Sequence, residues 1–415
     1  MDVINASSEQ ESAQPQPPVE ETQAAAIAPA EIDGARQQRA REYARIKHWL
    51  TLVDLALGAV ALAVVLVTGI ATSLRDALAG TGTWQPVAGW APLQVALFFL
   101  ILMVAYQILD APLSYYSGFV LPHRYGLSHQ SLGSWLGDQG KGLALGLVFE
   151  VGAVEVLYLL LAVQPNTWWL WAAGALLLVS VVLANLAPVL ILPLFFKLTP
   201  LQDEELSKRL LALAERANTR VRGVFTMNLS SKTTAANAAL MGLGNTRRIV
   251  LGDTLLGNYT PDEIEVVLAH ELGHHVHRDI WKLIVTQTVL VLGGLFVVNL
   301  VLHSIVQGSA TYHGLSDVAT MPLVAAALGV FGLVTMPLGN SFSRWVERQA
   351  DEYALTSTRM PDAFISSMTR LANQNLAELD PGPVIEFLLY DHPAIGKRLK
   401  HGEQFKAREM HTNAS

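Results

Sequence analysis

Residues 260–306 read TPDEIEVVLAHELGHHVHRDIWKLIVTQTVLVLGGLFVVNLVLHSIV. The stretch opens with a helix-start signal, because Thr260 can cap a helix, Pro261 suits its first turn and Glu263 completes a capping box. From Trp281 onward it is an apolar run, and about 20 apolar residues suffice to cross a bilayer. We therefore expect a polar helix that continues into a membrane span, so that an aqueous domain is joined directly to a membrane region.

The composition of the whole chain also favours a membrane protein. Hydrophobic residues make up 51% of the 415 residues and charged residues only 15%, whereas soluble proteins carry about 25% charged residues. The net charge of −7 gives no sign of nucleic-acid binding. The chain has no cysteine, which excludes thiol nucleophiles, thiolate metal sites and disulfides. Any metal must therefore be bound by His, Asp or Glu.

Six apolar runs are candidate membrane spans. The fourth run contains Asn185, Pro188 and Pro193, so we expect it to be kinked, or to leave the membrane near its end. Tryptophans stand near several of the span ends, where their rings prefer the membrane interface. The runs lie near residues 49–72, 91–116, 142–163, 168–196, 281–306 and 318–339.

The distribution of basic residues predicts the orientation of these spans, because Lys and Arg are enriched on the cytoplasmic side. The residues just before the first span are rich in them, and the opposite loops carry only Arg75. The amino terminus and the polar segments 198–279 and 340–415 are therefore expected on the cytoplasmic side, where the two segments can meet. The basic residues before the first span are Arg36, Arg39, Arg41, Arg45 and Lys47.

The segments outside the membrane predict a domain of helices and strands. Residues 202–218 have apolar positions at helical spacing and acidic residues in the first turn. Residues 221–230 and 247–253 are typical of short strands. The predicted fold class is a mainly α-helical, polytopic membrane protein of six transmembrane helices, with a cytoplasmic α+β domain that carries a small sheet.

The chain divides into five parts under this interpretation. The first is rich in Gln, Pro, Ala, Ser and Glu and poor in large apolar side chains, so we expect it to be disordered. Membrane parts then alternate with catalytic parts. The five are a tail over 1–45, a four-span region over 46–200, a catalytic segment over 201–279, a two-span region over 280–340 and a second catalytic segment over 341–415.

The motif His270-Glu271-Leu272-Gly273-His274 is the main chemical signal. Two histidines four residues apart lie on one face of a helix and can bind one metal ion, most often Zn²⁺. Glu271 then lies where it can accept a proton from metal-bound water. The alternative is a polar, His-rich helix face without a metal.

A catalytic zinc takes three protein ligands and a water, so a third ligand is required. Residues 343–354, SRWVERQADEYA, follow the last span and offer Glu347 and Asp351, four residues apart. Glu347 could bind the metal while Asp351 orients a ligating histidine through its other ring nitrogen. Spacing alone, however, favours an ordinary charged helix beside the membrane.

Several motifs together resemble the type I CAAX prenyl endopeptidases, a family of membrane gluzincins. The resemblance covers most of residues 115–400. One departure is the number of spans, because eukaryotic members of that family have seven. The motifs are YYSGFVLPHRYGLSHQS at 115–131, GDQGK at 137–141, NAALMGLGNTRRIVLGDTLL at 237–256, HELGHH at 270–275, SRWVERQADEYA at 343–354 and DHPAIGKRL at 391–399.

This resemblance implies a zincin-like catalytic domain with one Zn²⁺ per chain and Glu347 as the third ligand. It implies that His392 donates a hydrogen bond to the oxyanion of the tetrahedral intermediate, with Arg398 supporting the same region. Without the resemblance, a histidine before a proline is more often a plain loop residue. The resemblance also implies a substrate-binding strand edge at Asn237, Ala238 and Gly242, to which an extended peptide can add.

The expected function is zinc-dependent peptide hydrolysis inside a membrane, with Glu271 as the base. The expected partners are the lipid bilayer and a peptide or protein substrate that is C-terminally prenylated or membrane-embedded. The membrane would be a bacterial inner membrane or, in a eukaryote, an ER-type membrane. Three alternatives stay open: a non-catalytic zinc-binding membrane protein, a metal transporter, and a quality-control protease with non-prenylated substrates.

Overall fold

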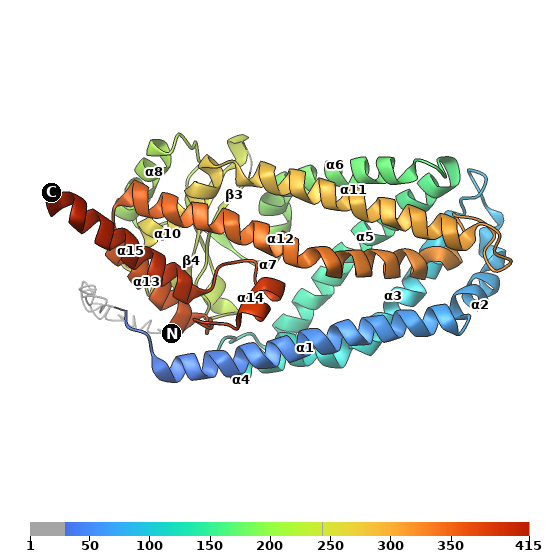
Figure 1. Ribbon diagram of the computed structural model, residues 1–415, viewed down its shortest axis with the longest axis horizontal. Helices are drawn as coiled ribbons and strands as arrows, with labels where there is room; N and C mark the ends of the chain where they lie inside the picture. The colour runs from blue at the N-terminus through green and yellow to red at the C-terminus, as the bar shows by residue number, and fades with distance from the viewer. Residues whose placement is uncertain (1–29, 243, 415) are drawn as a thin grey trace, which may run out of the picture.

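A computed structural model describes residues 30–242 and 244–414. Six helices in this part of the chain are long and apolar enough to cross a membrane, which confirms the number predicted. They run roughly along the long axis of the molecule (Figure 1). The six are Gly34–Val67, Pro92–Arg124, Leu132–Val163, Trp168–Phe195, Asp279–Val306 and Val318–Thr358.

The first of these helices, α1 (Gly34–Val67), begins earlier than predicted. Asp33 caps it by accepting hydrogen bonds from the backbone N–H groups of Ala35 and Arg36. The prediction of a disordered tail over 1–45 is therefore wrong for residues 34–45, which are helical, and residues 1–29 lie outside the described part. The helix ends before Gly69, whose left-handed φ of +75° turns the chain into α2 (Ile70–Ala77).

Two of the six spans are interrupted by wider, π-helical turns. The kink predicted in the fourth run is present, because the turn Ala187–Ile191 includes Pro188, and proline cannot supply the N–H of a regular helix. In order, the segments of the two spans are α3 (Pro92–Tyr115), η2 (Tyr116–Val120) and α4 (Leu121–Arg124), then α6 (Trp168–Leu186), η3 (Ala187–Ile191) and α7 (Leu192–Phe195). Besides α1, the uninterrupted spans are α5 (Leu132–Val163), α11 (Asp279–Val306) and α12 (Met321–Thr358).

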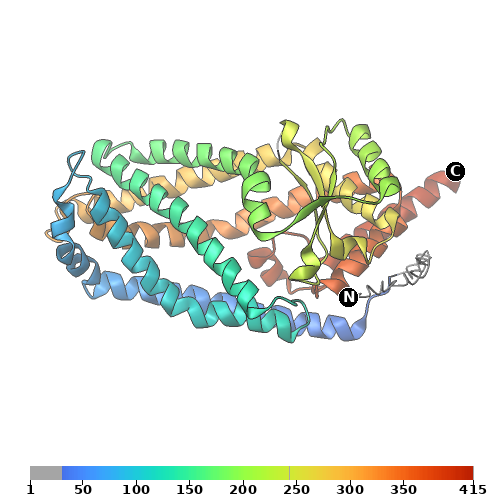
Figure 2. The same ribbon diagram turned by 180° about the vertical axis from the view of Figure 1, so that it is seen from behind.

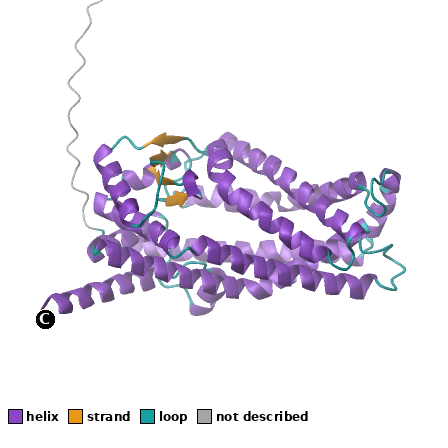
Figure 3. Ribbon diagram, turned by 90° about the horizontal axis from the view of Figure 1, so that it is seen from above, coloured by secondary structure: helices purple, strands orange, loops and turns teal. Residues whose placement is uncertain are grey.

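A four-stranded sheet lies at one end of the molecule (Figures 2 and 3). Its order is β1-β2-β4-β3, in which β2 and β4 are parallel and the outer pairs are antiparallel. The strands predicted within 221–230 and 247–253 are β2 and β4, and β3 occupies an edge. The strands are β1 (Leu198–Pro200), β2 (Val224–Met227), β3 (Ala238–Met241) and β4 (Arg248–Gly252).

Helices surround this sheet and build the main core of the polar end. Buried apolar side chains of α8, β4, α10, α12 and α13 pack into one cluster, with Leu210, Ile249, Leu268 and Phe364 at its centre. A second cluster, including Phe98, Trp168 and Val298, lies at the opposite end near α2 (Figure 1). The helices at the polar end are α8 (Glu204–Arg216), α9 (Asp253–Leu256), α10 (Pro261–Val276), α13 (Pro361–Gln374), α14 (Pro383–Leu389) and α15 (Ile395–Ala414). The short 3-10 turns in the described residues are η1 (Ala79–Thr83), η4 (Leu229–Ser231), η5 (Gly244–Thr246) and η6 (Val318–Thr320).

Candidate metal centre

Helix α10 carries the two histidines of the motif, and its start is fixed as the sequence predicts. Thr260 and Glu263 form a capping box, with Pro261 in the first turn. Contrary to the prediction, this helix does not continue into the fifth span. It ends at Val276, and Arg278 adopts a left-handed φ of +57° before α11 begins. This turn brings the first residue of α11 back beneath α10.

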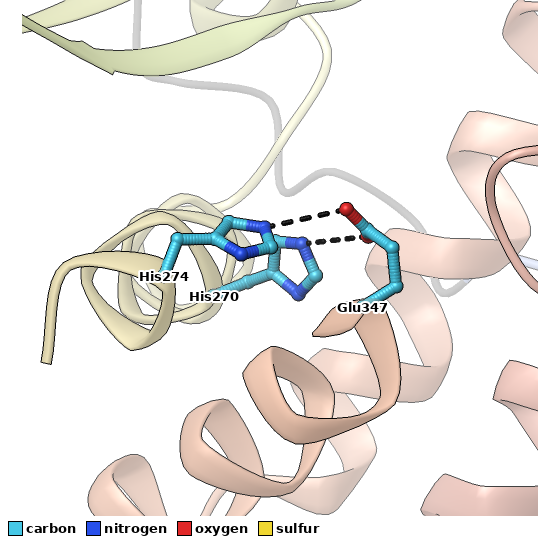
Figure 4. Close-up of side chains that lie close together, drawn as sticks. All are labelled: His270, His274 and Glu347. Carbon is cyan, nitrogen blue, oxygen red and sulfur yellow. Dashed lines mark ion pairs between the residues drawn. The ribbon is translucent and has the colours of Figure 1, made fainter. Parts of the chain in front are cut away.

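Three potential ligand atoms converge between α10 and α12 (Figure 4). His270, His274 and Glu347 each offer an atom within 4.8 Å of the other two. The Nε2 atoms of His270 and His274 lie 3.3 and 3.4 Å from the two carboxylate oxygens of Glu347. Tetrahedral zinc, with bonds of about 2.0–2.2 Å, separates its ligand atoms by about 3.3–3.6 Å. The cluster therefore has dimensions that could hold such an ion.

The carboxylate of Glu347 is buried, with only 7% of the residue exposed. Among the described residues, its Oε2 atom has no hydrogen-bond partner. A buried, unpaired carboxylate oxygen is costly unless a cation or a hydrogen-bond donor faces it. The residues present thus fit a bound cation better than a simple hydrogen-bonded cluster.

A second carboxylate orients each histidine from behind. Asp351 on α12 lies 2.9 Å from Nδ1 of His270, as the sequence interpretation anticipated for one ligating histidine. Asp279 lies 3.1 Å from Nδ1 of His274. With its Nδ1–H donated to a carboxylate, each imidazole turns its Nε2 atom toward the cluster, and in the neutral imidazole this atom carries the free lone pair. Asp279 was not predicted, although its place five residues after His274, buried beside a span, was a signal.

Each of these two carboxylates is in turn paired with a cation. Arg398 donates two hydrogen bonds to Asp351, of 2.9 and 2.6 Å, and is itself buried. Lys282 donates to Asp279 at 2.8 Å. Arg398 was expected to support the region of His392, but its contacts are with Asp351 and the ring of His270. It therefore acts on the histidine side of the cluster.

The electrostatics of the cluster favour a cation. Burial lowers the pKa of His270, but the adjacent carboxylates of Asp351 and Glu347 outweigh it and raise the pKa to about 9. A metal ion that binds Nε2 of His270 near neutral pH must therefore displace a proton.

Glu271 is partly exposed on α10, between the two histidines. No hydrogen bond or ion pair within 30–242 and 244–414 involves its carboxylate. Burial lowers the pKa of Arg398, but the charges of Asp351, Glu347 and, last, Glu271 outweigh it and raise that pKa. The side chain of Glu271 is thus not occupied by a structural contact.

His392 approaches the cluster from the loop between α14 and α15. Its Nε2 lies 3.4 Å from Glu347, and its Nδ1 lies 2.9 Å from Asp391. The pKa of His392 is raised above its ordinary 6.5, mainly by the hydrogen bond to Asp391. Burial lowers this pKa, and the charge of Glu347 raises it further. About half of the side chain is exposed, so a substrate can reach it.

Two residues that sequence reasoning missed hold this loop in place. The carboxylate of Glu386, on α14, accepts hydrogen bonds from the backbone of Ala394 at 3.3 Å and from Lys397 at 2.6 Å. Arg344, on α12, donates to the backbone carbonyls of Glu386 and Tyr390. Only the proximity of Arg344 to the motif around Glu347 could have indicated its part.

The predicted strand edge at Asn237, Ala238 and Gly242 corresponds to β3. Asn237 accepts a hydrogen bond from Gly252 on β4 at 2.9 Å. Because hydrogen-bonded and non-bonded positions alternate in an antiparallel pair, Ala238 and Leu240 direct their backbone groups to the outer side of β3. Gly242 has a φ of +90°, and a Cβ there would lie 2.7 Å from the carbonyl oxygen of Thr246. Gly242 thus ends the strand, and Leu240, inside the predicted stretch from Asn237 to Gly242, belongs to the edge.

Comparisons with known proteins agree with this arrangement. The family model described as CAAX prenyl protease N-terminal, five membrane helices, matches residues 19–197, and the model of peptidase family M48 matches residues 200–405. In the described part of 19–197, four helices reach spanning length.

Individual relatives cover most of the chain. An uncharacterized metalloprotease of Bacillus subtilis, YhfN, is 28% identical over 90% of this chain and 87% of its own. CAAX prenyl protease 1 of Saccharomyces cerevisiae is 30% identical over 70% of this chain and 68% of its own. The crystal structure of S. mikatae Ste24p superimposes with a TM-score of 0.76 at 25% identity, over 89% of both chains. The chain therefore belongs to peptidase family M48, as a membrane metallopeptidase of the CAAX prenyl protease type.

Proposed function

We propose that the metal of this peptidase is a single Zn²⁺ ion per chain, held by His270, His274 and Glu347. The observation that carries the proposal is the convergence of their ligand atoms within 4.8 Å. Two imidazoles and one carboxylate are a donor set typical of catalytic zinc, whereas Ca²⁺ and Mg²⁺ prefer oxygen ligands alone. Asp351 and Asp279 support the same assignment, because they fix the tautomers that a metal requires.

The chain's own residues then divide the work of hydrolysis. Zinc held by His270, His274 and Glu347 would polarise the scissile carbonyl and lower the pKa of an attacking water. Glu271 accepts the proton of that water and passes it to the leaving amine. His392 donates a hydrogen bond to the oxyanion of the tetrahedral intermediate. Asp391 orients His392 for this purpose and raises the pKa of its imidazole.

The outer side of β3 is proposed to bind the substrate backbone. The backbone groups of Ala238 and Leu240 are available to an extended peptide, which would add as a further strand. Asn237 anchors β3 to β4 from the other side, and Gly242 lets the chain turn away at the strand's end. β3 also packs against α10, the helix that carries His270 and His274. A peptide on this edge would therefore lie beside the metal.

Glu271→Gln is the direct test of the mechanism. The variant should bind one Zn²⁺ per chain, as measured by elemental analysis, yet lose about 10²–10⁴-fold in turnover, the range for a general base. Glu403→Gln, which removes an exposed carboxylate on α15, is the matched control and should retain activity. Retained cleavage by Glu271→Gln would refute the role of Glu271.

We propose a substrate whose cleavage site lies near a lipid-modified C-terminus or within a membrane-embedded segment. The support comes from the relatives named CAAX prenyl protease 1 and from the six apolar spans. The test compares a peptide that carries an S-farnesyl cysteine a few residues before its C-terminus with the same peptide without the farnesyl group, using purified protein in lipid nanodiscs. Preference for the prenylated peptide supports prenyl processing, and equal cleavage favours turnover of non-prenylated membrane proteins.

We propose that the metal centre faces the cytoplasm, with residues 201–279 and 341–415 on that side and 46–200 and 280–340 forming the membrane region. The basic residues before the first apolar stretch support this orientation. Because the chain has no cysteine, single cysteines report topology without background. Glu204→Cys should react with a membrane-impermeant maleimide only after the membrane is opened, and Ala88→Cys in intact cells. The reverse pattern would refute the orientation.

A further inference from the structure

A cavity of about 680 Å³ lies beside α1, away from the ligand atoms of the metal centre. One stripe of α1 forms most of its wall, with Arg41, Arg45, Trp49 and Leu52 spaced three or four residues apart. Such positions lie above one another on a single helix face. Ile385 on α14 closes the cavity from the other side, and Figure 1 shows α14 between α12 and α1.

The wall of this cavity changes from charged to apolar along α1. Arg41 and Arg45 precede the apolar run of the helix, Trp49 opens it and Leu52 lies within it. Trp49 is 65% exposed and Leu52 is 52% exposed. An exposed tryptophan at the start of a span marks the level of the lipid headgroups. The cavity therefore spans the level at which headgroups give way to acyl chains.

The positive and negative side chains of the cavity are equal in number, but they differ in how many partners they already have in the protein. Two arginines, Arg41 and Arg45, face two carboxylates, Glu42 and Glu378. Each carboxylate already has a phenolic partner, Tyr125 for Glu42 and Tyr390 for Glu378. The charge of Arg41 acts on Glu378, but neither arginine makes a hydrogen bond or a close ion pair with any residue in 30–242 and 244–414. The arginines are thus available to an anion, while the carboxylates retain acceptor oxygens.

We propose that this cavity binds the headgroup of a membrane phospholipid that carries both a phosphate and a primary ammonium, as phosphatidylethanolamine does. Arg41 and Arg45 donate hydrogen bonds to the phosphate. Glu42 and Glu378 accept from the ammonium. A purely anionic headgroup meets the two carboxylates without compensation, and a soluble phosphate leaves Leu52 and Ile385 without an apolar partner.

The cavity also adjoins the loop that carries His392. The ring of His48, which lines the cavity, lies 6.0 Å from the ring of Tyr390. Tyr390 hydrogen-bonds to Glu378 in the cavity wall and stands two residues before His392. A lipid in the cavity thus restricts Tyr390 and, through it, the position of His392. This consequence for turnover rests on the proposed role of His392, whereas the binding itself does not.

The test measures lipid binding by native mass spectrometry on delipidated, full-length protein in detergent. It uses the Glu271→Gln background, so that failure of the lipid proposal is separate from failure of the hydrolytic one. Added phosphatidylethanolamine should bind at least about tenfold more tightly than phosphatidylglycerol or phosphatidylcholine. Arg41→Gln/Arg45→Gln should lose at least about tenfold in affinity for phosphatidylethanolamine.

Lys47→Gln is the matched control, because it removes one positive charge from the same depth of α1 but from outside the cavity. It should bind phosphatidylethanolamine as the parent does, whereas Arg45→Gln alone should bind less. Glu378→Gln should abolish the preference for phosphatidylethanolamine over phosphatidylglycerol. Equal binding by Arg45→Gln and Lys47→Gln, a parent preference for phosphatidylglycerol, or displacement of the lipid by a peptide substrate overturns the proposal.

Discussion

Asp279 holds His274 from behind, with its Oδ2 atom 3.1 Å from Nδ1 of the imidazole. Asp279 is the first residue of α11, and only the left-handed turn at Arg278 places it there. Asp351 holds His270 in the same way from α12. The two histidines of one helix are thus oriented by carboxylates from two different helices.

Asp279→Asn should weaken zinc binding about 10–100-fold, because an amide cannot fix the tautomer of His274 as a carboxylate does. The measurement is competition with a chelator of known affinity. Asp262→Asn is the control, since it removes an exposed carboxylate of α10 that pairs with Arg209 and not with a histidine. Unchanged zinc affinity in Asp279→Asn would show that Asp279 is not a positioning residue.

Arg398→Gln should lower thermal stability and zinc affinity together, because it leaves the carboxylate of Asp351 buried without its bidentate partner. Breaking a buried pair from one side costs about 3–5 kcal/mol. The double variant Arg398→Gln/Asp351→Asn should recover part of the stability, since no unpaired charge is then buried. Calorimetric unfolding with and without zinc measures both effects. If turnover alone falls, Arg398 acts on the oxyanion instead.

Asp391→Asn should shift the alkaline limb of the kcat/KM profile to lower pH. The hydrogen bond to Asp391 is the largest cause that raises the pKa of His392, so the protonated donor persists above pH 6.5 and is lost as pH rises through the raised pKa. Without Asp391, the donor is lost at lower pH. Zinc content should stay unchanged. A limb that does not move would mean that His392 is not the group that titrates.

Glu386→Gln should reduce turnover about tenfold, less than the 10²–10³-fold loss typical when an oxyanion donor is removed, because it loosens the His392 loop without deleting it. Burial raises the pKa of Glu386, but Lys397 and the backbone of Ala394 outweigh it and hold the pKa below 4.5. The contribution of Glu386 to stability is therefore present at neutral pH and is lost as pH falls below about 4.5. Glu386→Gln should show a smaller loss of stability over that range, measured against Glu403→Gln.

The spans and the start of α10 could be predicted because their signals are local. Apolar length identifies a span, and Thr260, Pro261 and Glu263 form a cap from neighbouring residues alone. The role of Asp279 could not be predicted, because it depends on one backbone angle at Arg278. Strand β1 is too short to give a pattern, and Pro200 within it argues against a strand.

The contacts of Glu347, Arg398 and His392 are long-range, and spacing within a motif does not fix them. The family resemblance supplied Glu347 and His392, and the structure brings both to the two histidines. It placed Arg398 in the right neighbourhood but not beside its actual partner. The sequence indicated Asp351 as a residue that orients a histidine. It did not indicate which of the many arginines would pair with Asp351.

The two supports of the metal centre differ mechanically. Glu347 stands on α12, a single helical rod from Met321 to Thr358 that also crosses the membrane. The histidines stand on α10, which the turn at Arg278 separates from its own span. A tilt of α12, such as a thinner or thicker bilayer imposes, would therefore move Glu347 together with its own span. The same tilt would reach His270 and His274 only across the packing of α10 against α12, where a Cβ at Gly273 would lie 3.0 Å from the Cα atom of Ala350.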